Sequence, residues 1–173
     1  THLMYKALPT VTKLTVGGTL TNGTVDLYKF KVTANTGDVD LYKFTFDITT
    51  TTVLVTNVDL VDVTEDTEVS LYTLALDQTN NVAYIGATLN STDQGSSGGM
   101  AKTVSMSTPR TYVLRGTISG ASSGDSVSTR MGGDSANHGQ AAATLMTTAI
   151  LVDADLNDDF IWSDRNASAH ATT

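Results

Sequence analysis

The residues best suited to chemistry form an acidic run, DADLNDD, at positions 153–159. Side-chain oxygens recur there at every second position, and calcium prefers carboxylate and amide oxygens. The spacing resembles the first half of a calcium loop, although Asp158 stands where such a loop has glycine and no glutamate follows at the twelfth position. The alternative is an acidic turn after a buried strand. Calcium is the one cofactor that the sequence suggests, with the ligands Asp153, Asp155, Asn157 and Asp159.

Two further patterns relate to catalysis or to transition metals, and both are incomplete. Residues 95–99, GSSGG, match the G-x-S-x-G expression of a nucleophilic serine, but the helical pattern that such a site needs does not follow. The histidines, His2, His138 and His170, are not at ligand spacing from one another, and the chain has no cysteine. The sequence therefore predicts no catalytic residue and a protein that is not an enzyme.

Composition narrows the class of protein. The 173 residues carry 10 Lys and Arg against 18 Asp and Glu, a net charge of −8, which argues against a nucleic-acid partner. No apolar run approaches the length that spans a membrane, so no transmembrane segment is expected. Threonine and valine are abundant, and both favour strands. This polar, threonine-rich composition is typical of secreted surface proteins, so we expect an extracellular location at the cell surface.

The hexapeptide VDLYKF occurs twice, at residues 25–30 and 39–44. Alternation with a period of two predicts two strands, each with an aromatic face directed to the core. The intervening NTG, residues 35–37, fits a hairpin loop with Gly37 in the left-handed conformation. The same alternation also fits two strands that cross between the sheets of a sandwich. The second copy is expected to place Tyr42, Phe44, Phe46 and Ile48 on one face, opposite Leu41, Lys43 and Thr45.

About ten strand candidates recur along the chain at a spacing typical of a β-sandwich. The segment 53–63 has a break near Asn57 that suggests a bulge. The segment 69–76, VSLYTLAL, is almost wholly apolar and predicts a central strand covered on both sides. In the segment 111–119, Tyr112, Leu114 and Ile118 alternate with polar residues and Val113. The predicted fold is all-β, an immunoglobulin-like β-sandwich of roughly 8–10 strands with an extended N-terminal arm.

Three parts are expected along the chain: an extended arm or linker at 1–9, the sandwich at 10–163, and a polar tail at 164–173. The arm is too apolar to be left in water. Addition of such a segment as a strand to the sheet edge of a second copy would give it backbone partners and side-chain pockets. Docking on its own domain, or service as an interdomain linker, are the alternatives. The expected subunit contacts are Leu3, Tyr5, Leu8, Val11 and Leu14.

Several blocks together resemble a family of surface proteins. They are YKALPTVTKL, DLYKFKVTANTGDVDLYKFTF, YVLRGTISGASSGDSVSTRMGGD and NDDFIWSDRNASAH. These blocks resemble Thr/Ser-rich β-sandwich modules of cell-surface proteins from uncultured candidate-phyla bacteria. The resemblance implies an exported, non-enzymatic β-domain in a surface layer, filament or long adhesin. It carries over no functional residues.

We therefore expect a structural subunit of a cell-surface assembly whose partners are other copies of the chain. A filament, a pilus-like fibre or a surface layer would each follow from subunits joined by strand addition. The alternative is an adhesin module of a larger surface protein. That module would bind glycan, or protein on a host or neighbouring cell, through the polar loops at 90–99 and 131–140.

Overall fold

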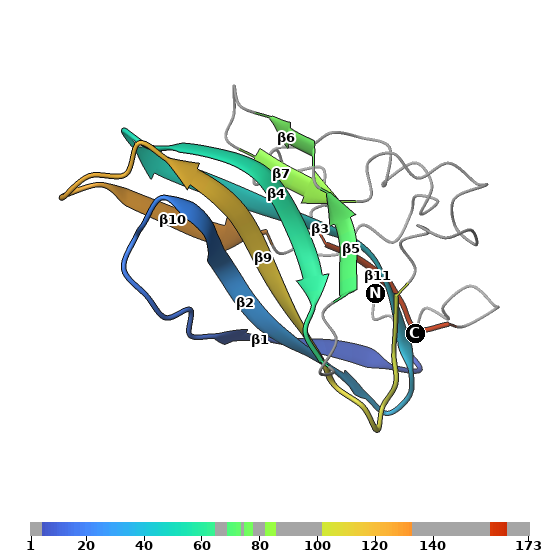
Figure 1. Ribbon diagram of the computed structural model, residues 1–173. Helices are drawn as coiled ribbons and strands as arrows, with labels where there is room; N and C mark the ends of the chain where they lie inside the picture. The colour runs from blue at the N-terminus through green and yellow to red at the C-terminus, as the bar shows by residue number, and fades with distance from the viewer. Residues whose placement is uncertain are drawn as a thin grey trace.

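The computed structural model describes residues 5–64, 69–73, 75–77, 82–85, 102–132 and 160–165. All regular secondary structure in these ranges is β-strand, so the all-β prediction is confirmed for this part of the chain (Figure 1). The strands are β1 (Leu8–Leu14), β2 (Gly23–Asn35), β3 (Val39–Thr51), β4 (Leu54–Asp62), β5 (Val69–Thr73), β6 (Ala75–Asp77), β7 (Val82–Ile85), β8 (Lys102–Val104), β9 (Arg110–Ser119), β10 (Ser126–Met131) and β11 (Phe160–Ser163).

The strands form two antiparallel sheets. The order in one is β1-β2-β9-β4-β5. The order in the other is β10-β3-β7-β6, with β8 and β11 also paired to the long β3. Figure 1 shows β2, β9 and β4 side by side as one layer, with β3 and β10 behind them. Buried residues of both sheets form one hydrophobic core, an arrangement consistent with a β-sandwich.

Aromatic rings occupy the centre of that core. Phe30 of β2 lies 5.3 Å from Phe44 of β3 and 5.3 Å from Tyr112 of β9, measured between ring centroids. Tyr112, Leu114 and Ile118 of β9 are at most 1% exposed, and Val113, which alternates with them, is also 1% exposed. Successive side chains of a strand point to opposite faces, so the position of a residue within the strand decides whether its side chain faces the core.

The two VDLYKF copies lie in different sheets and do not pair with each other. β2 pairs with β1 and β9, whereas β3 pairs with β7, β8, β10 and β11. Of the two arrangements that the sequence allowed, the chain adopts the crossing one. The expectation for Gly37 is wrong: the left-handed residue of the connection is Thr36, with φ 65°. Thr36 also donates from its hydroxyl to the Lys6 carbonyl, at 2.9 Å, which ties the turn to the N-terminal segment.

Each copy of the hexapeptide contains a β-bulge, which the alternation pattern did not reveal. In β2 the pairing with β9 shifts between Asp26 and Tyr28, so Leu27 has no register partner in β9. In β3 the pairing with β11 skips Tyr42. A bulge adds one residue and reverses the faces beyond it. Leu41 is consequently buried, like Phe44, Phe46 and Ile48, and its predicted position on the opposite face is wrong.

The apolar segment 69–76 is not one central strand. β5 is the last strand of the five-stranded sheet, and β6 is the last strand of the other sheet's main path. The predicted single central strand is therefore wrong, because β5 and β6 belong to different sheets. The predicted irregularity near Asn57 is confirmed: Asn57 has φ 49°, and the β4–β9 register shifts between Thr56 and Asp59.

Candidate functional site

One long side of the sandwich is an open rim, formed by β1 of one sheet and β10 of the other. Within the described ranges, each of these strands pairs with a single neighbour, β1 with β2 and β10 with β3. β1 covers only part of β2, because its last pair joins Leu14 to Lys29. Residues 23–28 of β2 therefore have no β1 partner. Free backbone groups on a sheet edge are the groups to which an added strand binds.

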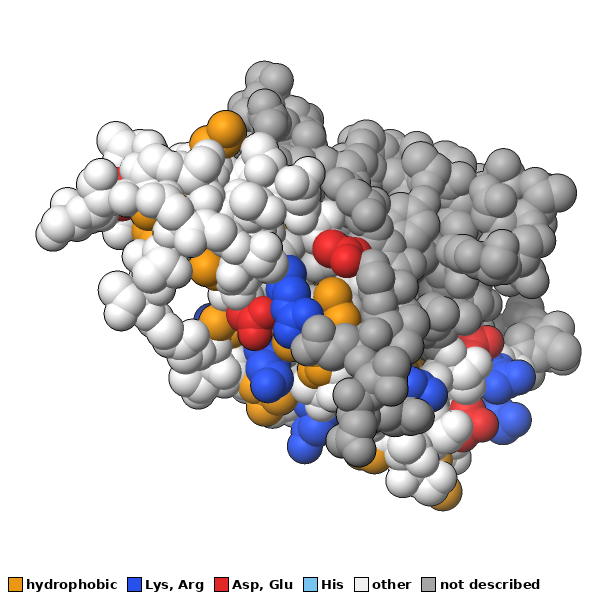
Figure 2. Space-filling view, viewed as in Figure 1, with side chains coloured by type: hydrophobic (Ala, Val, Ile, Leu, Met, Phe, Trp, Pro, Cys, Tyr) orange, Lys and Arg blue, Asp and Glu red, His pale blue; other side chains and the backbone are white. Residues whose placement is uncertain are grey.

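Beside this uncovered stretch the rim is hollowed. Two adjoining hollows, of about 540 and 690 Å³, share Val16, Leu27 and Val127 in their walls. Leu27 and Val127 also pack against the core, and they contribute apolar surface to a recess whose walls are otherwise mostly polar. Charged groups, among them Lys13 and Asp125, line its sides. In Figure 2 the chain at the left encloses an opening with hydrophobic side chains beside it. The recess thus places two partly buried apolar side chains beside a stretch of β2 that has no β1 partner among the described residues.

The connection between β1 and β2, residues 15–22, forms the outer wall of the recess. It contains no strand, and Gly18 adopts φ 125°, a conformation that favours glycine. A side chain added at Gly17 or Gly18 would meet no atom within 4 Å, so this connection is loosely packed. It is fixed at its far end, where the Ala121 N–H donates to Asn22 Oδ1 at 2.8 Å.

The residues before β1 are docked on the same chain. The Lys6 N–H donates to Asp164 Oδ2 at 2.8 Å, and Asp164 is only 1% exposed. The Tyr5 ring lies 5.1 Å from the Trp162 ring, between centroids. Ala7 is fully buried, close enough to Gly37 that a Cβ there would come within 3.3 Å of the Ala7 Cβ. Residues 5–7 therefore join the β2–β3 turn to the segment that follows β11.

Of the predicted subunit contacts, Leu8, Val11 and Leu14 lie in β1, Tyr5 precedes it, and Leu3 is outside the described residues. Tyr5 contacts Trp162, as described above. Val11 is partly buried against the core, and Leu14 lines the smaller hollow. Leu8 is 48% exposed at the start of β1. In a single chain these side chains pack on, or lie exposed beside, their own domain. Contact with a second copy stays a prediction.

The predicted calcium ligands, Asp153, Asp155, Asn157 and Asp159, lie outside the described residues, as do the loop 90–99 and most of the loop 131–140. In the part of the chain that the structure describes, no three Asp, Glu or His side chains gather closely enough to hold a metal ion. The calcium prediction therefore stays a prediction.

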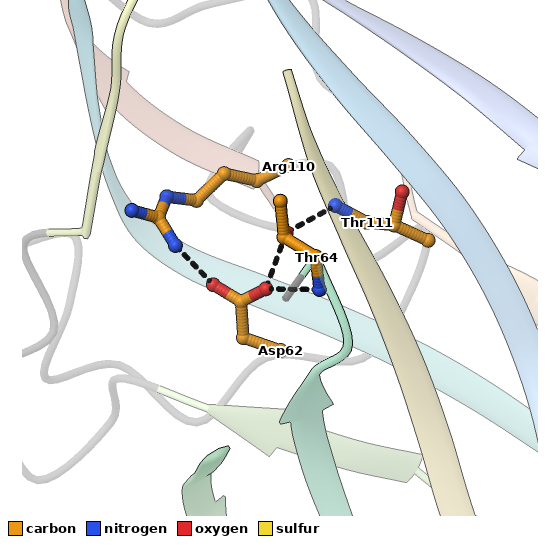
Figure 3. A network of polar contacts seen from close by, with 4 residues as sticks. All are labelled: Asp62, Thr64, Arg110 and Thr111. Atoms are coloured by element: carbon orange, nitrogen blue, oxygen red, sulfur yellow. Dashed lines mark hydrogen bonds and ion pairs between the residues drawn. The ribbon is translucent and has the colours of Figure 1, made fainter. Parts of the chain in front are cut away.

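A polar network lies at one end of the core (Figure 3). Asp62 is 7% exposed, and its Oδ2 accepts from Arg110 at 2.8 Å. Its Oδ1 accepts from the N–H of Thr64 at 2.9 Å and from the Thr64 hydroxyl. The Thr64 oxygen in turn accepts from the Thr111 N–H at 2.9 Å. Because both carboxylate oxygens of Asp62 have donors, the network is suited to joining β4 to β9 rather than to binding a ligand.

Beside this network, the Tyr112 hydroxyl is buried without a hydrogen-bond partner among the described residues. Burial raises the pKa of Tyr112, and the negative charge of Asp62 raises it further, while the positive charge of Arg110 partly offsets both. The neutral phenol is therefore the form that the core accommodates.

Sequence reasoning missed Asp164 and Val127. Asp164 was assigned to a polar tail, yet its carboxylate is buried and accepts a hydrogen bond from a residue 158 positions away. An aspartate directly after an aromatic strand was the only local signal. The place of Val127 in the recess depends on residues of β2 and of the 15–22 connection, so no local pattern could reveal it.

Comparison of the chain with protein-family models, with curated proteins and with solved structures found no match. Across the described ranges, no helix has the length and apolar character needed to cross a membrane.

Proposed function

We propose that this protein is a non-enzymatic structural subunit of an extracellular assembly on the cell surface, such as a filament, a pilus-like fibre or a surface layer. Its domain would be an immunoglobulin-like β-sandwich, and its partners other copies of the same chain. The observation that carries the proposal is the open rim. There, the stretch of β2 without a β1 partner and the edge strand β10 flank a recess into which Leu27 and Val127 contribute apolar surface.

Strand addition accounts for each feature of this rim. An extended segment from a second copy would pair its backbone with a free edge, and alternate side chains would enter the recess. Val25, Leu27 and Val127 would then be covered, and they are already partly buried against the core. A contact between different surfaces of two copies repeats without closing unless the rotation forms a ring, and an open series makes a filament.

The extracellular location is supported by the threonine-rich, weakly charged composition, with 16% charged residues. The net charge of −8 favours solubility of the free subunit. Binding of glycan or of a host protein remains the alternative outcome, and glycan arrays would detect it.

Negative-stain imaging of the purified protein tests the proposal directly. Filaments or sheets are expected, and isolated particles at all concentrations would contradict it. The informative variant is Val127→Lys, because a charge that points into the recess disfavours edge pairing. Ser119→Lys is the matched control, since Ser119 is an exposed strand residue that lines neither hollow. Assembly should be lost in the first variant and kept in the second, with both proteins folded by circular dichroism.

A further inference from the structure

The N-terminal segment, residues 5–14, packs on distant parts of its own chain. These parts are β2, the turn at Thr36 and Gly37, and Asp164, and together they are called the seat of the segment. Ala7 is fully buried against Gly37, and Lys6 is held at both backbone groups. Its N–H donates to Asp164, and its carbonyl accepts from Thr36 at 2.9 Å. All of these contacts are non-covalent, so a second copy of the same segment would make them equally well.

The seat is unfavourable in free energy when no segment is bound to it. Asp164 is 1% exposed and accepts one of its hydrogen bonds from the Lys6 N–H. A buried carboxylate that loses a donor is costly, because nothing replaces the water that it gave up. Removal of the segment would also uncover residues 29–35 of β2, on which seven residue pairs hold β1. An empty seat would therefore attract an equivalent segment from another molecule.

β1 is well placed to leave as a unit. It is the end strand of its sheet, so no other described strand depends on it. Its register is marked by Asn35, whose Nδ2 donates to the Leu8 carbonyl at 3.3 Å and to Thr10 Oγ1 at 2.6 Å. These contacts would guide a returning or incoming segment to the same alignment.

The connection at 15–22 has the character of a hinge. Gly17 and Gly18 are surrounded by open space, and the two hollows lie between this connection and the sandwich. Few contacts are lost when such a segment changes its path. A hinge loop between an edge element and the rest of a domain is the condition under which copies exchange that element.

We propose that the N-terminal segment exchanges between copies, so that residues 5–14 of one molecule fill the seat on β2, Thr36 and Asp164 of the next. The hinge at 15–22 then runs between the two molecules. The inference rests on the proposed function, because it names the contact that joins the copies. The N-terminal segment is the donor, and the seat on residues 29–35 of β2, rather than the recess beside residues 23–28, is the acceptor. One-way donation from each copy to the next builds an open chain of subunits, whereas mutual exchange closes a dimer.

Engineered cysteines test the exchange, since the natural chain has none. Thr12 and Lys31 are register partners in β1 and β2, and neighbours of this kind lie within reach of a disulfide. The double variant Thr12→Cys, Lys31→Cys is oxidised first to show that the pair closes within one chain. If this disulfide closes poorly, the cysteines are placed instead at Val11 and Val32, which are the adjacent register partners.

The decisive sample is a mixture of the two single variants, Thr12→Cys and Lys31→Cys, unfolded together, refolded under assembly conditions and oxidised. Exchange predicts a covalent heterodimer. Thr12→Cys mixed with Thr24→Cys is the matched control, because Thr24 lies on β2 beyond the β1 register. We expect the heterodimer to exceed the control by about tenfold or more, since only the seat aligns both thiols. Equal yields in the two mixtures would overturn the exchange.

The oxidised double variant separates the exchange from the proposed function. Its segment is locked to its own chain, so exchange predicts that assemblies are lost on oxidation and restored by reductant. If the locked chain assembles as well as the natural one, the exchange is refuted and the structural function stands. If the natural chain never assembles, the structural function fails irrespective of the cysteine result.

Discussion

The rings of Phe30 and Phe44 meet edge to face across the sandwich, with centroids 5.3 Å apart and planes at 62°. The two residues hold the same position in the two VDLYKF copies, one in each sheet. Edge-to-face contact is a favoured geometry for aromatic pairs, because the positive edge of one ring meets the negative face of the other. The repeated hexapeptide thus supplies both halves of one contact at the centre of the core.

Truncation of that contact should strongly destabilise the domain. Phe44 is 3% exposed, and we expect Phe44→Ala to lower the free energy of unfolding by about 3–5 kcal/mol, through lost burial and the cavity left behind. Urea unfolding followed by circular dichroism measures the change. Leu54→Ala is the control, because Leu54 is 52% exposed and its loss should cost about 0.5 kcal/mol or less. Similar costs for the two variants would contradict the description of the core.

The Tyr112 hydroxyl should be dispensable at neutral pH. It is buried and has no hydrogen-bond partner among the described residues, so Tyr112→Phe removes a desolvated polar group. We expect the variant to equal the natural protein or to exceed it by about 1 kcal/mol in unfolding free energy at pH 7. One ordinary hydrogen bond contributes about 1 kcal/mol. If Tyr112→Phe lowers the free energy of unfolding by about 2 kcal/mol or more, the hydroxyl has a partner.

A rise to alkaline pH should lower the stability of the natural protein by more than it lowers the stability of the Tyr112→Phe variant. The pKa of Tyr112 is raised in the folded state by burial and by Asp62, and burial also raises that of Tyr28. A raised folded-state pKa contributes stability below the unfolded value of about 10, and that stability is lost as the pH rises toward the folded value. Melting temperatures between pH 8 and 12 provide the measurement. Parallel curves for the two proteins would count against the buried position of this phenol.

Gly116 should be sensitive to a single added methyl group. A Cβ there would lie 2.8 Å from Leu27 Cδ1 and 3.1 Å from Val55 Cγ1, so neighbouring side chains must move. We expect Gly116→Ala to cost about 1–3 kcal/mol of unfolding free energy, the range for an overpacked core. Gly17→Ala is the matched control, because nothing lies within 4 Å of its added carbon. Chemical denaturation of both variants should separate them clearly, and equal stabilities would be inconsistent with the packing of Leu27 over β9.

Calcium should stabilise the protein if Asp153, Asp155, Asn157 and Asp159 bind it. Binding to the folded state alone adds about 2.7 kcal/mol when free calcium is one hundred times the dissociation constant. Melting curves in millimolar calcium and in chelator test this, and Asp155→Asn should reduce the difference. Identical curves for the natural protein in the two buffers would remove calcium from consideration.

Local alternation predicted several of the strands and part of the core. Tyr112, Leu114 and Ile118 face inward because a strand directs every second side chain to one face. The irregularity at Asn57 was also visible, since it interrupts that alternation within a few residues. These properties depend on neighbours in the sequence, so the sequence by itself determined that the described part of the chain is all-β and has aromatic inner faces.

Pairing between distant strands decided the strand order, the positions of the bulges and the contacts of the N-terminal segment. The alternation of VDLYKF is the same in a hairpin and in a crossover, and only the registers with β9 and β11 place the bulges at Leu27 and Tyr42. Neither the bond from Lys6 to Asp164 nor the recess behind Val127 has a local signature, because each joins segments brought together by folding. Tertiary structure alone therefore decided the open rim and the seat of the N-terminal segment, since strand order is set by the free energy of the whole sandwich.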